Sequence, residues 1–178
     1  MKFFGFICLV ILLASCSDFS KGDQLEAINN LNKTVDSIET VLIENNMDEI
    51  KEISIEAESI ISRIKENIKS DTLEISFAEK IDDYVTMYKS IEPLGEIYNT
   101  LRKNIKAEKI ALIKLERDID HGNGERSKYS DFINFESKKI NNVTKVLVKY
   151  ISKRKKMISI YSSYHEKLYV YSFNLITK

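Results

Sequence analysis

The stretch of residues 128–176, KYSDFINFESKKINNVTKVLVKYISKRKKMISIYSSYHEKLYVYSFNLI, decides the fold. Apolar and aromatic side chains recur along it at alternating steps of three and four residues, with Glu136 and Arg154 as the only charged members of the repeat. The repeat positions are Tyr129, Ile133, Glu136, Ile140, Val143, Leu147, Tyr150, Arg154, Met157, Tyr161, Tyr164, Leu168, Tyr171 and Leu175. Because a seven-residue repeat keeps one seam of a helix facing its partners, the stretch predicts one long helix in a coiled-coil-like bundle.

The same repeat runs through the middle of the chain with one slip. Its positions are Phe77, Ile81, Tyr84, Tyr88, Ile91, Leu94, Tyr98, Leu101, Ile105, Glu108, Leu112, Leu115 and Ile119. Between Ile91 and Leu94 the step is three residues where four were due, and Pro93 stands at this slip. Since proline lacks an amide hydrogen and clashes with the carbonyl four residues back, we expect a second long helix that kinks there.

Residues 24–69 carry a third apolar face. Its members are Ile28, Leu31, Val35, Ile38, Leu42, Met47, Ile50, Ile53, Ala57, Ile61, Ile64 and Ile68. The polar stretch IENNMDE (43–49) leaves the helical register of this face intact, so we expect a single helix from 24 to 69. The alternative is a break near Asn45 and Asn46, which would give a four-helix bundle.

The composition and the spacing of polar, loop-forming stretches support long helices. The chain has one Pro and five Gly, and charged residues make up 30% of it. The polar stretches KGD (21–23), KSDT (69–72) and DHGNGERS (120–127) divide it into three segments of similar length. Helices of about 45 residues would be roughly 70 Å long, and short loops make neighbours antiparallel. The prediction is therefore an all-α fold, an elongated antiparallel three-helix bundle over residues 24–178.

Charge is balanced overall, with 27 basic and 27 acidic residues, but it is unevenly placed. Residues 18–66 contain twelve acidic and five basic side chains, whereas residues 137–165 contain eight basic and no acidic ones. An acidic first helix beside a basic third helix would have complementary flanks, which favours one packing arrangement over others.

The N-terminal run MKFFGFICLVILLASC (1–16) determines the predicted compartment. Its apolar part is about a dozen residues long, too short for the roughly 20 that cross a membrane, and it has the proportions of a secretory signal. Leu13, Ala14 and Ser15 run directly into Cys16. This order resembles the lipobox of bacterial lipoproteins. The resemblance implies that residues 1–15 are removed, that Leu13, Ala14 and Ser15 are recognised by the processing enzyme, and that Cys16 is acylated on its sulfur and its new amino terminus.

The lipoprotein resemblance fixes the fate of both cysteines. Cys8 would be lost with the signal and Cys16 would become the membrane anchor, so no disulfide is expected. Residues 16–23 would form a short lipidated tether. Ser17 follows Cys16 in place of the Asp that retains many lipoproteins in the inner membrane, which favours the outer membrane, at its periplasmic face or at the cell surface.

Two clusters near the C-terminus are candidate interaction sites. The first is the basic run KYISKRKKM (149–157), with Lys153, Arg154, Lys155 and Lys156. An exported protein meets no nucleic acid in its normal compartment, so lipid headgroups, envelope polysaccharide or a host glycan are the better candidates, and a simply solvated helix face is the alternative. The second cluster is aromatic. It comprises Tyr164, Tyr169 and Phe173, residue types that often anchor protein interfaces.

Enzymatic and metal sites are not expected. The loop DIDHGNGE (118–125) has Asp118 and Asp120 spaced like calcium ligands, but Gly122 and Asn123 reverse the order that a calcium loop requires. Both Gly122 and Gly124 are better explained as helix-ending residues. No nucleophile–base motif and no cofactor motif is present. The sequence thus predicts a lipid-anchored envelope protein that binds an envelope or host protein or an envelope polymer, with a surface-displayed adhesin or host-ligand-binding protein as the alternative.

Overall fold

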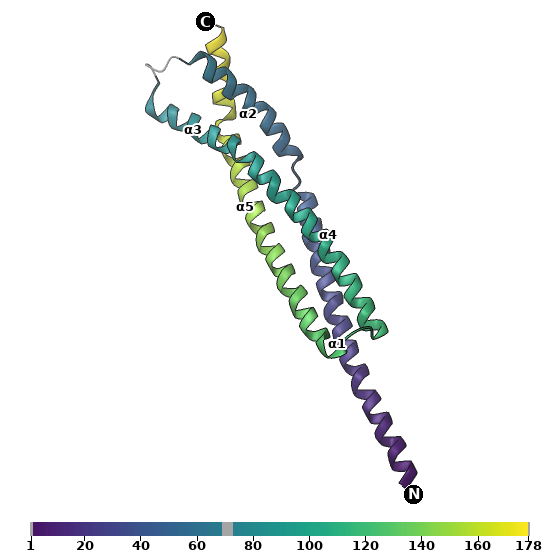
Figure 1. Ribbon diagram of the computed structural model, residues 1–178. Helices are drawn as coiled ribbons and strands as arrows, with labels where there is room; N and C mark the ends of the chain where they lie inside the picture. The colour runs from purple at the N-terminus through teal and green to yellow at the C-terminus, as the bar shows by residue number, and fades with distance from the viewer. Residues whose placement is uncertain (1, 69–72, 178) are drawn as a thin grey trace. The chain divides into compact units, whose positions relative to one another are not determined.

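The computed structural model describes the backbone of residues 2–68 and 73–177 and the side chains from Ser20 onward within those ranges. Its helices are α1 (Lys2–Glu44), α2 (Asp48–Asn67), α3 (Ile75–Lys89), α4 (Ile91–His121), the short 3-10 helix η2 (Arg126–Lys128) and α5 (Tyr129–Ile176) (Figure 1). No strand occurs in the described backbone, so the predicted all-α fold is confirmed. The side chains of the predicted lipobox, Leu13, Ala14, Ser15 and Cys16, lie outside the described residues.

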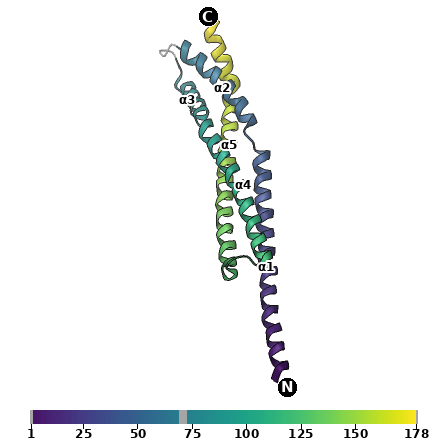
Figure 2. The ribbon, with the colours of Figure 1, turned by 45° about the vertical axis from the view of Figure 1, so that its right-hand side comes forward.

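The chain forms two compact units. The first unit comprises Met1–Val41 and Arg102–Lys145, and the second comprises Leu42–Leu101 and Val146–Lys178. In the first unit α1, α4 and α5 run side by side (Figure 2). Lys21 of α1 pairs with Asp120, and Asp36 pairs with Lys109 of α4 at 2.8 Å. These pairs follow opposite orders along the two helices, so α1 and α4 are antiparallel as predicted. Residues 20–23, expected to lie in the tether, belong to α1.

In the second unit α5 packs against α2 and against the α3–α4 segment, and α2 also contacts α3. Glu49 and Arg63 of α2 contact Arg154 and Tyr169 of α5, in parallel order. Phe77 of α3 packs edge-on against Tyr171 with ring centroids 4.7 Å apart. Helix α2 contributes five isoleucines to the core, Ile50, Ile53, Ile60, Ile61 and Ile64, all at most 5% exposed. Each such side chain contributes about 1.5–3 kcal/mol when buried.

The three predicted long helical segments are confirmed, but the first of them, over residues 24–69, is broken, because α1 ends at Glu44 and α2 begins at Asp48. The break near Asn45 and Asn46, the predicted alternative, is the one that the structure has. The Asn46 side chain accepts a hydrogen bond from the Asp48 N–H at 2.9 Å, which competes with the helical ladder at this point. All members of the predicted apolar face from Ile28 to Ile68 are nevertheless buried or half-buried, so the register survives the break.

The middle segment is interrupted at Ser90, three residues before Pro93. Because Pro93 has no N–H, the carbonyl of Lys89 receives no helical hydrogen bond from it, whereas the Leu94 N–H donates to the Ser90 carbonyl at 3.2 Å, so the helical pattern resumes directly after the interruption. The Ser90 hydroxyl donates to the Met87 carbonyl at 2.6 Å and closes the end of α3. Pro93 itself lies in the first turn of α4, where proline is tolerated.

The loop after α4 ends the helix in the way that its glycines predict. Gly122 has φ +67° and Gly124 has φ +82°. The N–H groups of Gly122 and Asn123 donate to the carbonyls of Ile119 and Asp118 at 3.2 and 2.7 Å, the paired bonds of a Schellman motif. The Tyr129 hydroxyl then donates to the carbonyls of Asp118 and Asn123, which ties the loop to the start of α5.

The helix predicted over residues 128–176 is confirmed as α5, and its repeat positions are all buried or half-buried. Tyr150 is 0% exposed, and Ile140 and Leu168 are each 1% exposed. Ser172 lies off the repeat and is also 0% exposed, which the periodicity did not predict. Its hydroxyl donates to the Tyr169 carbonyl at 2.8 Å, so a small polar side chain is accommodated in the core.

Candidate functional site

A groove of about 480 Å³ lies in the second unit, between α5 and the α3–α4 interruption. Its lining residues are Asp83, Thr86, Met87, Ser90, Pro93, Leu94, Lys153, Lys156, Met157 and Ile160. The floor is apolar, since Met87, Leu94 and Met157 are 2%, 1% and 3% exposed. The volume falls within the range of about 300–1,000 Å³ that is usual for small-molecule pockets.

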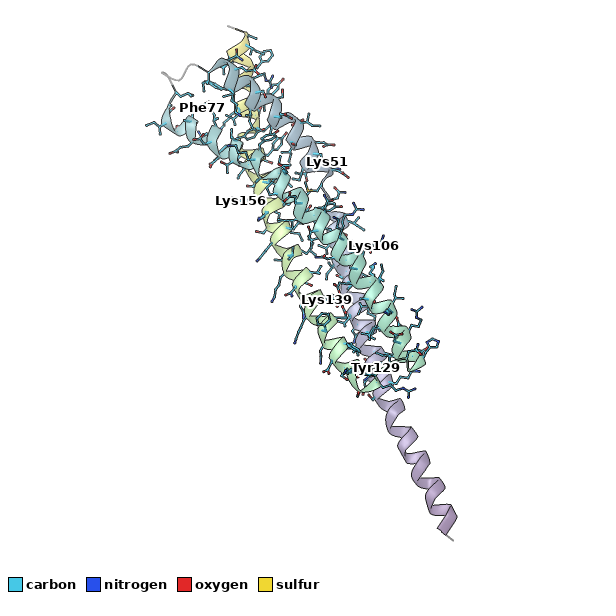
Figure 3. The ribbon with its side chains drawn as sticks, viewed as in Figure 1. Lys51, Phe77, Lys106, Tyr129, Lys139 and Lys156 are labelled. Carbon is cyan, nitrogen blue, oxygen red and sulfur yellow. The ribbon has the colours of Figure 1, made fainter. Side chains whose placement is uncertain are left out.

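Lys153 and Lys156 give the groove its charge. They stand one turn apart on α5 and therefore share a face of that helix; Figure 3 labels Lys156. Neither ammonium group forms an ion pair or hydrogen bond with any residue that the structure describes. Lys155, between them in sequence, is exposed and does not line the groove. The structure thus places two of the four predicted basic residues together at the groove.

Asp83 of α3 lies at the other end of the groove. Its carboxylate is 3.5 Å from the hydroxyl of Tyr164, which lies one turn beyond Ile160 on α5. The seven-residue separation of Lys153 and Ile160 corresponds to about 10 Å of helix. The groove therefore has cations at one end, a carboxylate at the other and an apolar floor between them.

Arg154, the fourth predicted basic residue, forms contacts within the second unit and does not line the groove. Its Nε donates to the Asn46 carbonyl at 3.1 Å, and its Nη2 lies 2.5 Å from the Glu49 carboxylate. The Tyr150 hydroxyl donates to the Asn45 carbonyl at 2.6 Å. Tyr150 and Arg154 of α5 thus donate hydrogen bonds to the two backbone carbonyls at the break between α1 and α2. This explains why a charged residue occupies a position of the apolar repeat.

The predicted aromatic cluster remains accessible at the C-terminal end of α5. Tyr169 and Phe173 are each 47% exposed, while Tyr164 is half-buried. The Arg63 guanidinium lies 5.2 Å from the centre of the Tyr169 ring, a cation–π contact that fixes one face of this ring. Val170 and Ile176 are 52% and 50% exposed nearby on the same helix.

A polar aromatic cluster in the second unit was missed by the sequence reasoning. The Tyr84 hydroxyl lies 3.0 Å from Nδ1 of His165, and the His165 ring packs on Tyr161 with centroids 4.4 Å apart. Nε2 of His165 is 3.6 Å from the Glu56 carboxylate, to which the Tyr161 hydroxyl donates. Burial raises the pKa of both tyrosines above the usual value. The four-residue spacing of Tyr161, His165 and Tyr169 was the signal that these rings stack.

The first unit holds a charge cluster in which Glu108 is buried and Glu136 and Lys139 are half-buried. Glu108 occupies a repeat position and is 5% exposed, and Nζ of Lys139 lies 3.0 Å from its carboxylate and 2.9 Å from that of Glu136 (Figure 3). Burial raises the pKa of the Glu108 carboxyl, and the neighbouring Glu136 adds to this effect while Lys139 opposes it. Such clusters set helix register more often than they bind ligands.

A polar cavity of about 360 Å³ also lies in the first unit, where the α4–α5 loop meets α1. Charged side chains that line this cavity pair with other groups of the first unit. Lys21 pairs with Asp120 at 2.9 Å, which lowers the pKa of the Asp120 carboxyl, and Nε of Arg126 donates to the Gly122 carbonyl. This cavity therefore offers less to a ligand than the groove of the second unit.

Among the described side chains no group of three or more His, Cys, Asp and Glu residues could hold a metal ion. Within the same part of the chain no helix is long and apolar enough to cross a membrane. No protein-family model matches the sequence, and neither a curated protein nor a solved structure is similar to it.

Proposed function

We propose that this chain is a lipid-anchored cell-envelope protein that acts by binding another molecule and has no chemistry of its own. The order Leu13, Ala14, Ser15, Cys16 supports the anchor. The observation that carries the binding role is the groove of the second unit, where Lys153 and Lys156 face an apolar floor without ion-pair partners among the described residues.

The buried polar groups favour binding over catalysis. Tyr84 and His165 form the phenol–imidazole pair that most resembles a nucleophile and its base. However, Tyr84 is 1% exposed and does not line the groove, so a substrate in the groove would not reach its hydroxyl. The Glu108–Lys139 cluster is likewise packed between helices of the first unit.

The anchor is tested by metabolic labelling with an alkyne analogue of palmitate. We expect the wild-type chain to incorporate the label and Cys16→Ala to lose it. Cys8→Ala is the matched control, because Cys8 lies within the apolar run that would be removed, and its labelling should match wild type. Labelling that persists in Cys16→Ala, or that is absent from wild type, would refute the lipid anchor.

A second candidate function is surface display with binding of a host ligand. The exposed Tyr169, Val170, Phe173 and Ile176 at the end of α5 favour it, because aromatic and aliphatic side chains of this kind anchor protein interfaces. Protease treatment of intact cells separates the two candidates. Digestion would support surface display, and protection until the outer membrane is permeabilised would support a periplasm-facing role.

A further inference from the structure

The groove of the second unit has the features of a site for a small molecule with one acidic head and one apolar chain. We infer that it binds an amphiphile with one acidic head group, a carboxylate or a phosphate, that lies between Lys153 and Lys156, and with an apolar chain that lies along the floor. This inference rests on the proposed binding role but is independent of the lipid anchor.

The head group is inferred from the two lysines. Three lysines that bridge helices in the described chain, Lys21, Lys109 and Lys139, each lie within 3.0 Å of an Asp or Glu oxygen. Lys153 and Lys156 have no such partner in the described structure. Both lysines are exposed, and two ammonium groups one turn apart beside an apolar surface together attract an anion.

The apolar chain is inferred from the floor. Met87, Leu94 and Met157 form a nearly solvent-excluded surface, and methionine side chains adapt to irregular apolar ligands. Of the length of about 10 Å from Lys153 to Ile160, the head group between the two lysines takes about half, and the rest accommodates the first four or five carbons of the chain. Asp83 at the far end disfavours a second acidic group there, so the ligand carries a single acidic head.

The size of the groove favours a small molecule over a protein helix. A helix about 10 Å across would fill about 800 Å³ over the same length. The groove holds about 480 Å³. A single alkyl chain with its head group therefore fits the space better than a docked helix does.

The proposal is tested by isothermal titration calorimetry on the chain that begins at Ser17, which retains every described core residue of both units. Octanoate and octyl phosphate are the probes, and their relative affinity distinguishes the two head groups. We expect one site for at least one of these anions, at least tenfold weaker binding of 1-octanol and no binding of octyltrimethylammonium. Failure of both anions to bind, or equal binding of the cation, would overturn the inference.

Variants locate the site. Lys153→Gln/Lys156→Gln should weaken the anion at least tenfold, and Lys155→Gln, the matched control outside the groove, should bind like wild type. Thr86→Trp should also abolish binding, because Thr86 is exposed at the rim and a large ring there fills the groove without entering the core. Circular dichroism checks that each variant keeps its helices. Unchanged affinity in the double variant, or an equal loss in Lys155→Gln, would contradict the assignment whatever the outcome of the palmitate labelling.

Discussion

The hydroxyl of Tyr150 stabilises the break between α1 and α2, and its removal gives a direct test of this role. Tyr150 is 0% exposed, its ring packs on Tyr98 with centroids 5.8 Å apart, and its hydroxyl donates to the Asn45 carbonyl at 2.6 Å. Tyr150→Phe keeps the ring and removes this bond. We expect the free energy of unfolding to fall by about 1–3 kcal/mol, the range for losing a buried hydrogen-bond partner.

The stability that Tyr150 contributes also depends on pH, because its phenol titrates. Burial raises the pKa of Tyr150 to about 12, against 10.0 for an unperturbed tyrosine. Since the folded-state pKa lies above the unfolded-state pKa, the favourable contribution of the neutral phenol is complete below pH 10 and is lost as pH rises from 10 through 12. At about 1.4 kcal/mol per pKa unit, the loss reaches roughly 3 kcal/mol. The stability difference between wild type and Tyr150→Phe should therefore narrow over this window.

Urea denaturation followed by circular dichroism at pH 8, 10, 11 and 12 measures both effects. Tyr164→Phe is the matched control, because the Tyr164 hydroxyl is 3.5 Å from its nearest described partner and outside hydrogen-bond range in strict terms. Its loss should change stability by less than about 0.5 kcal/mol. Equal losses in the two variants, or a Tyr150→Phe difference that stays constant with pH, would refute the role assigned to Tyr150.

Three further substitutions test the rest of the fold. Burial raises the pKa of Glu108, so the stabilising contribution of its neutral carboxyl is complete below pH 4.5 and is lost as pH rises through the folded-state pKa. In thermal melts from pH 4 to 8, the melting temperature of Glu108→Gln relative to wild type should therefore rise with pH, and parallel profiles would contradict this. Gly122→Ala should cost about 1 kcal/mol or more in urea denaturation, because φ is +67° and a new Cβ would collide with the Arg126 side chain, while Gly22→Ala in open helical space should not destabilise. Leu112→Ala, at a position 0% exposed, should cost about 2–5 kcal/mol by the same assay, and a loss under 1 kcal/mol would contradict its place in the core.

Helix content and burial followed from the sequence because a helix fixes which residues share a face. Ile140, Tyr150 and Leu168 were assigned to a seam by spacing alone, and all three are buried. The break at residues 45–47 was harder to predict, because the apolar register continues through it. The groups that satisfy its carbonyls, Tyr150 and Arg154, lie more than 100 residues further along the chain. Local periodicity contains no information about such partners.

Only part of the candidate site could be predicted from the sequence. The basic run was apparent, but the sequence alone does not distinguish Lys153, Lys155 and Lys156. Only the packing of α5 against the α3–α4 interruption shows that Lys153 and Lys156 line the groove and that Lys155 does not. Helical spacing could have grouped Lys153 with Lys156 and set Lys155 apart. His165 was missed for a related reason, since its partner Tyr84 comes from another helix.

The most direct test of binding in the groove uses the methionine methyl groups. The chain from Ser17 contains Met47, Met87 and Met157, and only Met87 and Met157 line the groove. With ¹³C-methyl methionine, titration of octanoate or octyl phosphate should shift the Met87 and Met157 resonances progressively and leave Met47 in place. Shifts confined to Met47, equal shifts of all three, or no shift at saturating ligand would contradict the account.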